Sequence, residues 1–104
     1  MTQIFEVKNG RLTVKDDLYW DSEELFDKAV QELLDSPEKD LAIDLSQVSF
    51  IFSPFMGHIV RFCMSAREMK KNPSVLIGKQ LEDIFKSSGL MTELPIKLIS
   101  RNSA

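Results

Sequence analysis

The chain has 104 residues, 43% hydrophobic and 28% charged, and its 13 Lys and Arg against 16 Asp and Glu give a net charge of −3. This balance predicts one ordinary globular domain over residues 1–104 and excludes a disordered chain, a nucleic-acid binder with a basic stripe and an apolar membrane-spanning helix. The N-terminus lacks a signal-peptide pattern and Cys63 is the sole cysteine, so we expect a cytoplasmic protein without disulfides.

The chain opens with a predicted β-hairpin. Ile4, Glu6 and Lys8 alternate with Phe5 and Val7, and Asn9-Gly10 follows them. Asn-Gly is a strong hairpin signal because both residues tolerate a positive φ. We therefore expect residues 11–14 to return as the second strand.

A first helix is predicted to begin at Asp21 and to end before Pro37. Asp21 is expected to cap the first amides, with Glu24 completing a capping box three residues later. Trp20 and Leu25 are placed to form a hydrophobic staple across this start. The apolar positions recur at helical spacing and are Leu25, Phe26, Ala29, Val30 and Leu33.

The middle of the chain predicts a buried strand followed by a long helix. Residues 41–45 are almost wholly apolar, which is typical of a central strand, and a second apolar stretch covers residues 48–52. Ser53 suits the N-cap and Pro54 suits the first helical position, where its missing N–H is harmless. The helical pattern then continues to about residue 70.

Three further elements follow in the last third of the chain. They are a short strand at residues 74–77, a helix at residues 80–88 closed by Gly89, and a strand at residues 96–99. A hairpin followed by alternating strands and helices predicts an α/β fold, with a mixed sheet of about five strands and three helices. The sequence leaves open whether all three helices cover one face of the sheet.

Catalytic and metal-binding patterns are missing from the sequence. His58 lies five positions after Ser53, about 140° away around a helix, and no acidic residue is evident that would orient it. Cys63 is a further five positions away, and structural zinc needs four converging ligands. The acidic residues look scattered over capping and surface positions. We therefore expect no enzyme, no metal and no cofactor.

The helix predicted after Ser53 carries two apolar lines. One arc is expected to face the core and consists of Phe55, Ile59, Phe62, Cys63, Ala66 and Met69. A second line, displaced by roughly 100°, consists of Met56, Val60 and Met64. Two interpretations stay open: neighbouring loops cover the second line, or it is an exposed strip that binds a partner.

Residues 41–57, LAIDLSQVSFIFSPFMG, resemble the central segment of STAS domains. These are the anti-sigma-factor antagonist domains, which also occur at the end of sulphate transporters. Their pattern is an apolar strand ending Asp-Leu-Ser, an apolar pair, and Asp-Ser-Ser/Thr-Gly-Leu-Gly opening a helix. Residues 81–90 look like the third helix of the family and its closing Gly-Leu. With the leading hairpin, the resemblance covers essentially the whole chain and implies a STAS-like sheet.

The functional motif of the family is matched only in part. The resemblance places Ser53 on the serine that a partner kinase phosphorylates and Gly57 on the last glycine. Phe52, Pro54 and Phe55 replace the acidic residue, the second hydroxyl residue and the first glycine. Either the kinase is shaped differently or the switch has been lost. The expected partner-binding residues are Phe52, Pro54, Phe55, Met56, Gly57, Val60 and Met64.

The resemblance implies a non-enzymatic regulatory domain that binds a serine-kinase-type anti-sigma factor or a related regulator. The alternative is a cytoplasmic STAS subunit of a membrane transport complex, which would bind constitutively and without phosphorylation. A small enzyme is a third possibility, for which the chain supplies no catalytic constellation.

Overall fold

The computed structural model of the chain describes residues 4–99, and its frame is a five-stranded sheet. The strands lie in chain order and are β1 Phe5–Lys8, β2 Arg11–Val14, β3 Asp40–Leu45, β4 Asn72–Ile77 and β5 Ile96–Leu98. The first pair is antiparallel and the other pairs are parallel. The predicted mixed α/β sheet is confirmed.

The β1–β2 hairpin turns at Asn9-Gly10, as predicted. Asn9 has φ 53° and Gly10 has φ 77°, which is the pair of positive values that a two-residue turn of this kind needs. A Cβ atom on Gly10 would also lie 2.8 Å from the carbonyl oxygen of Asp40. Both the backbone conformation and the close approach of the next strand therefore require glycine here.

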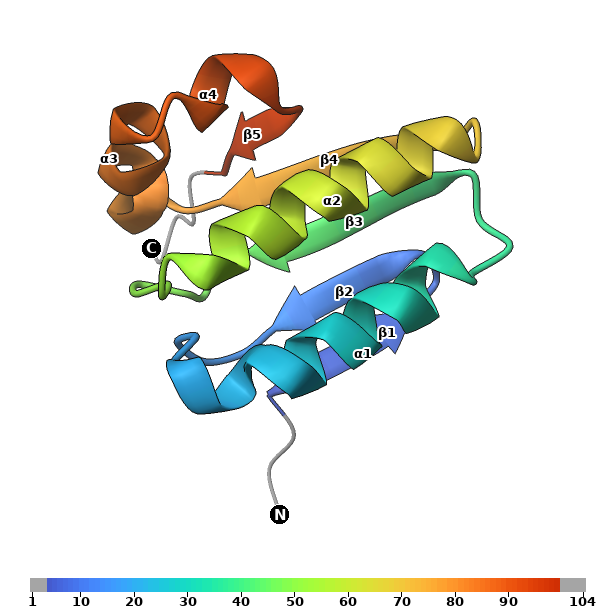
Figure 1. Cartoon of the computed structure of the whole chain (residues 1–104), viewed down its shortest axis with the longest axis horizontal. Coiled ribbons are helices and arrows are strands. Elements are labelled where there is room, and N and C mark those ends of the chain that lie inside the picture. The colour runs from blue at the N-terminus through green and yellow to red at the C-terminus, as the bar shows by residue number, and fades with distance from the viewer. Residues whose placement is uncertain (1–3, 100–104) are drawn as a thin grey trace.

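Helices cover one face of the sheet and one of its edges. They are the 3-10 turn η1 Trp20–Ser22, α1 Glu23–Leu34, α2 Pro54–Glu68, α3 Lys79–Ser87 and the short α4 Leu90–Glu93, which the sequence did not predict. In Figure 1, α1 and α2 lie side by side in front of the sheet, and α3 and α4 lie beside β4 and β5. None of the helices in residues 4–99 has the length and apolar character needed to cross a bilayer.

The core lies between the sheet and the pair α1 and α2. Inward-facing side chains of the central strands meet the apolar faces of both helices, and the fully buried ones include Leu12, Leu41, Ile43, Ile77, Phe26, Phe55, Ile59 and Phe62. The rings of Phe26 and Phe55 join the two helices edge to face at 5.2 Å. None of the helices in the described part of the chain covers the opposite face of the sheet in Figure 1, and that face exposes polar side chains such as Arg11 and Asp40.

The predicted start of the first helix is wrong in detail. Asp21 lies inside η1, so its backbone is already helical and it is not the residue before the first turn of α1. Ser22 holds that position and makes no side-chain cap hydrogen bond. Trp20 and Leu25 are 72% and 57% exposed, so they form no hydrophobic staple, and Leu25 is not a core residue.

The end of α2 also differs from the prediction. Met69 was expected on the core arc, yet it is 46% exposed. The helix ends at Glu68, and Lys70 has φ 62°. Met69 therefore lies between the helix and this turn and does not follow the helical period. The other five residues of the predicted core arc are buried.

Candidate protein-binding site at the start of helix α2

The loop that leads into α2 is held by one carboxylate from the segment after β2. Oδ1 of Asp17 accepts hydrogen bonds from the backbone N–H groups of Ser49 and Phe50, at 2.7 and 3.1 Å. The Ser49 hydroxyl donates to the same carboxylate at 3.1 Å. Because one anion accepts several donors, the loop before α2 and the β2–α1 segment are joined at this point.

Backbone hydrogen bonds extend this junction and decide which side chains face outward. Leu18 N–H donates to the Phe50 carbonyl and Phe52 N–H donates to the Leu18 carbonyl, both at 3.0 Å. Leu18 and Ile51 are buried. Since side chains of an extended segment alternate between its two sides, Phe50 and Phe52 point outward and are 41% and 40% exposed.

The Asp-Leu-Ser sequence at the end of β3 forms a structural turn. Oδ1 of Asp44, a residue only 7% exposed, accepts hydrogen bonds from the Ser46 backbone N–H at 2.9 Å and from its hydroxyl at 2.6 Å. Oδ2 of Asp44 lies 3.3 Å from a guanidinium nitrogen of Arg11 on β2. These contacts satisfy the buried charge and direct the chain out of the sheet toward α2.

The first turn of α2 leaves the Ser53 side chain exposed and uncommitted to the helix. Ser53 is the N-cap residue, but its backbone is already helical and its side chain makes no cap hydrogen bond. Pro54 has no N–H, and the N–H groups of Phe55 and Met56 donate to the carbonyls of Phe52 and Ser53. The prediction that the Ser53 hydroxyl caps the helix is therefore wrong, although the helix does begin at Ser53-Pro54.

The residues expected to bind a partner divide by exposure. Phe52, Ser53, Pro54, Gly57 and Met64 are exposed, whereas Met56 and Val60 are half-buried. Phe55 is fully buried against Phe26, so it is a core residue and cannot contact a partner. The others lie along the outer rim of α2 from its start to Met64. We call these seven residues, Ser53 included and Phe55 left out, the α2 rim.

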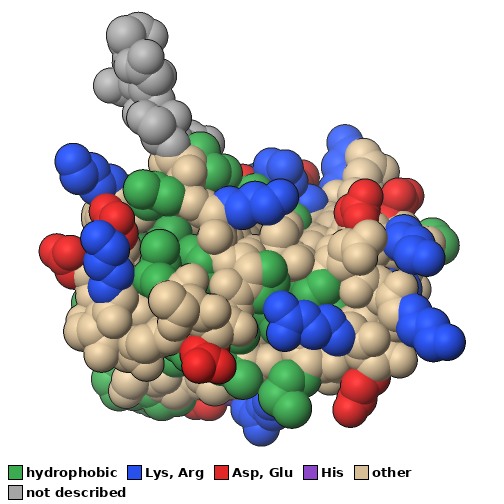
Figure 2. All heavy atoms as spheres, turned by 90° about the horizontal axis from the view of Figure 1, so that it is seen from above, with side chains coloured by type: hydrophobic (Ala, Val, Ile, Leu, Met, Phe, Trp, Pro, Cys, Tyr) green, Lys and Arg blue, Asp and Glu red, His purple; other side chains and the backbone are tan. Residues whose placement is uncertain are grey.

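Negative charge is concentrated beside this site, which the sequence reasoning missed. Residues 16–27 contain six carboxylates, and neither Lys nor Arg occurs among them. The sequence shows this concentration as a run of acidic residues without Lys or Arg, but the prediction of the first helix treated Asp21 and Glu24 only as capping residues. On the side that carries α3, α4 and β5, Figure 2 shows side chains of both charges, Lys and Arg as well as Asp and Glu, spread among hydrophobic ones.

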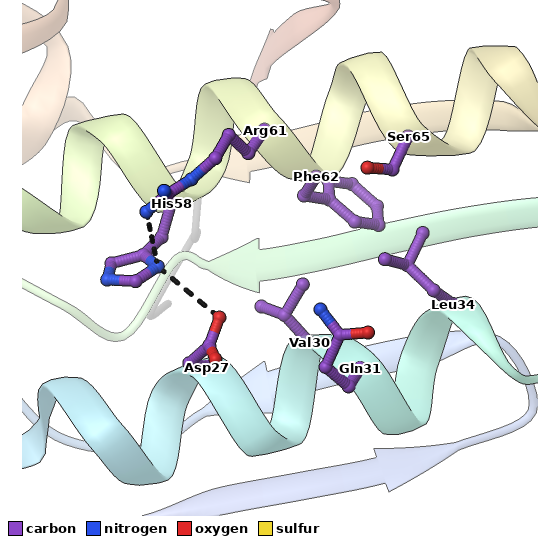
Figure 3. A pocket seen from close by; sticks show the side chains of 8 residues that line it. All are labelled: Asp27, Val30, Gln31, Leu34, His58, Arg61, Phe62 and Ser65. Atoms are coloured by element: carbon purple, nitrogen blue, oxygen red, sulfur yellow. Dashed lines mark hydrogen bonds and ion pairs between the residues drawn. The ribbon is translucent and has the colours of Figure 1, made fainter.

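His58 joins α2 to α1 through charged contacts. Its Nε2 lies 2.8 Å from a carboxylate oxygen of Glu23, and its Nδ1 lies 3.5 Å from Asp27 and 3.2 Å from Arg61. Figure 3 shows the ring between the two helices, over a hollow of about 310 Å³. The expectation that no acidic residue orients His58 is thus wrong, because helix packing brings together residues 35 positions apart.

His58 and Cys63, two residues of α2, differ in their surroundings. His58 contacts Glu23, Asp27 and Arg61, and among residues 4–99 no hydrogen bond joins it to a hydroxyl or thiol group. Burial raises the pKa of the Cys63 thiol to about 11, although nearby Arg67 acts in the opposite direction. The thiol is therefore protonated and poorly nucleophilic at neutral pH. Within residues 4–99, no group of three His, Cys, Asp or Glu side chains is placed to hold a metal ion.

Comparison with known proteins identifies the fold. The sequence matches no protein-family model, and no curated protein matches it in sequence. The structure is similar to the crystal structure of an anti-sigma factor antagonist from Mycobacterium paratuberculosis, with a TM-score of 0.69 and 18% sequence identity. The similarity covers 98% of this chain and 86% of that chain. The chain therefore has the fold of an anti-sigma factor antagonist, the STAS fold.

Proposed function

We propose that the chain is one non-enzymatic regulatory domain of the cytoplasm that binds a serine-kinase-type anti-sigma factor or a related regulator. The observation that carries this proposal is the α2 rim, where apolar side chains are exposed around Ser53 at the start of a well-packed helix. Exposed apolar surface on a rigid element is typical of a protein-binding site. Fold similarity to an anti-sigma factor antagonist supports the choice of partner class.

The rim offers a graded apolar surface to such a partner. Phe52 and Met64 are the most exposed apolar side chains at its two ends, at 40% and 56%. Met56 and Val60 lie between them and are partly covered. Methionine side chains adapt their shape to different surfaces, which suits a reversible regulatory contact. Gly57 has open space where a Cβ would stand, so the middle of the rim is accessible to a partner.

We infer that Ser53 is the phosphoacceptor of this switch. Its side chain is exposed, and no cap hydrogen bond ties it to α2. A phosphate there adds a charge of about −1.5 to −2, which a partner covering Phe52 and Pro54 would have to desolvate. The N–H groups of Phe55 and Met56 already donate to backbone carbonyls, so they are not available to neutralise that phosphate. Phosphorylation would therefore leave the fold intact and release the partner.

The experiment compares Ser53→Asp with Ser87→Asp, an exposed serine on α3. Wild type and both variants are used as tagged baits in the native cell, and bound proteins are quantified by mass spectrometry together with phosphorylation at Ser53. We expect a phosphorylated fraction at Ser53 and loss of an anti-sigma factor or related regulator from Ser53→Asp alone. The same partner on all three baits and an unmodified Ser53 would contradict the switch.

One observation favours the alternative, a constitutive STAS subunit of a membrane transport complex. The exposed neighbours of Ser53 are Phe52 and Pro54, which offer a kinase neither an acidic side chain nor a second hydroxyl. A domain of this kind would stay bound whatever the state of Ser53. Co-purification of wild type and Ser53→Asp with a transporter in the membrane fraction would support this alternative over the partner switch.

A further inference from the structure

Four aromatic side chains are exposed on two segments that are joined to each other, the β2–α1 segment and the loop before α2. Tyr19, Trp20, Phe50 and Phe52 are 51%, 72%, 41% and 40% exposed. The rings of Tyr19 and Phe50 stack at 5.3 Å with 26° between their planes. We call these four side chains the aromatic platform. Exposed apolar surface this dense is uncommon on a soluble domain and marks an interaction surface.

The platform is held in place by the core. Asp17 and Leu18, directly before Tyr19, bond to the backbone on both sides of Ile51, between the two phenylalanines. Leu18 and Ile51 are buried. The exposed rings thus stand on backbone that is anchored on both segments, and their exposure is not the result of a loose loop. A preorganised surface loses less conformational entropy when it binds.

The charge beside the platform indicates which partner it fits. A hollow of about 520 Å³ opens against Trp20, and the other residues that line it are Asp21, Glu23, Glu24, Asp27 and His58. Arg61 lies 3.2 Å from Nδ1 of His58 and is not one of the residues that line this hollow. The wall therefore consists of one large aromatic ring, the imidazole of His58 and four carboxylates, of which Glu23 and Asp27 contact His58 and Asp21 and Glu24 are exposed. Such a surface attracts Lys and Arg side chains, which pair with carboxylates and lie over indole faces.

We propose that the aromatic platform docks a basic amphipathic polypeptide segment. Its Lys or Arg side chains enter the hollow beside Trp20, and its apolar side chains cover Tyr19, Phe50 and Phe52. The inference deepens the proposed function, because it names the chemistry of the partner segment next to the α2 rim. An acidic segment or a nucleic acid is repelled by the six carboxylates of residues 16–27.

Trp20 is the sole tryptophan, so its fluorescence reports on the platform directly. The probe is a synthetic amphipathic peptide of Lys and Leu, titrated into the full chain beside a peptide of Glu and Leu with the same spacing. We expect a saturable blue shift with the Lys peptide alone. Affinity should fall as salt is raised, because the Debye length is about 10 Å at 0.1 M and shrinks above it.

Variants distinguish binding at the aromatic platform from a general effect of net charge. Glu24→Lys and Glu32→Lys change the net charge equally and are both exposed on α1, but only Glu24 lines the hollow. We expect Glu24→Lys and Phe52→Ala each to weaken peptide binding about tenfold, as central interface residues do, and Glu32→Lys to change it less than about twofold. Equal effects of the two charge reversals, or equal binding of the Glu peptide, would overturn the proposal.

Two further outcomes distinguish the causes of a failure. Concentration-dependent dimers in sedimentation that disappear in Trp20→Ala would show that a second copy covers the platform, which overturns the docking of a basic segment. Absence of peptide binding together with loss of the cellular partner from Ser53→Asp would overturn this inference alone. Peptide binding with a partner indifferent to Ser53→Asp would support this inference and contradict the proposed switch.

Discussion

The two sides of helix α2 differ in how completely they are covered. On the side facing α1, Phe55 packs against Phe26, and His58 reaches the carboxylates of Glu23 and Asp27. On the other side, none of the helices in residues 4–99 lies alongside α2 in Figure 1, because α3 and α4 lie at the β4–β5 edge. That side carries Met56 and Val60, which are half-buried, and Met64, which is exposed.

One amphipathic pattern therefore serves two purposes along the same helix. The closed side has side chains that fit one another, and a change there should cost folding free energy. The open side has apolar side chains without a covering element, and a change there should cost binding. We therefore expect substitutions on the closed side to lower the free energy of unfolding and substitutions on the open side to weaken binding.

The largest effect is expected at the closed side. Phe55→Ala removes a ring that is fully buried between α1 and the sheet, and such truncations cost about 3–5 kcal/mol of unfolding free energy. Phe52→Ala removes the same kind of side chain from the exposed loop and should cost less than about 1 kcal/mol. Urea unfolding of the two variants measures the difference. Similar losses in both would show that the loop is as much a part of the core as α2.

A second prediction concerns the buried thiol of Cys63 on α2. Burial raises the pKa of Cys63 from 9.0 to about 11, so the folded state favours the protonated form. The unfolded thiol ionises first as pH rises, and this contribution to stability is lost between about pH 9 and pH 11, up to roughly 3 kcal/mol. The free energy of unfolding of wild type should therefore fall more steeply over this range than that of Cys63→Ala. Parallel curves would contradict the burial of the thiol.

The junction before α2 should make a smaller contribution. Asp17→Asn weakens the acceptor for Ser49 and Phe50, and hydrogen bonds to a charged group contribute about 1.5–3 kcal/mol when well formed. Because these bonds are exposed to water, we expect a loss of about 1 kcal/mol. Asp21→Asn, at an exposed position of η1, is the control and should be neutral. Amide exchange at Phe50 and Phe52 should become faster in Asp17→Asn only.

Met64, the exposed residue of the open side, should show the smallest stability effect, and the open side as a whole should show the largest binding effects. Met64→Asp changes a side chain that is 56% exposed and should alter stability by less than about 0.5 kcal/mol. Met56→Asp and Val60→Asp should cost about 1–2 kcal/mol, because they place a charge at half-buried positions. Thermal unfolding measures all three variants. If Met64→Asp is as damaging as Met56→Asp, the strip is core and not a binding surface.

The sequence predicted the elements better than their ends. Asn9-Gly10 and Ser53-Pro54 encode local geometry in two residues each, and both elements begin where they were expected. The pairing of His58 with Glu23 depends on how α1 and α2 pack, so local periodicity could not reveal it. The cap at Asp21 failed because a 3-10 turn precedes α1 and shifts the boundary to Ser22.

The candidate site was predictable from its helix but not from its surroundings. Periodicity separated Met64 from Ile59, and the structure leaves the first exposed and the second buried. Periodicity also placed Phe55 on the core arc. The structure confirms this placement and contradicts the assignment of Phe55 to the binding surface. The aromatic platform depends on Leu18 and Ile51 pairing across a gap of 33 residues, which no local pattern encodes.

The most direct test of the central claim is binding by the α2 rim in the native cell. Tagged wild type, Met64→Asp and Lys8→Asp, an exposed charge reversal on β1, are purified and their bound proteins quantified by mass spectrometry. We expect one regulator to be recovered with wild type and Lys8→Asp and to be depleted at least about tenfold with Met64→Asp, while all three proteins unfold at similar temperatures. Equal recovery of that regulator on all three baits would contradict the claim that α2 carries the binding surface.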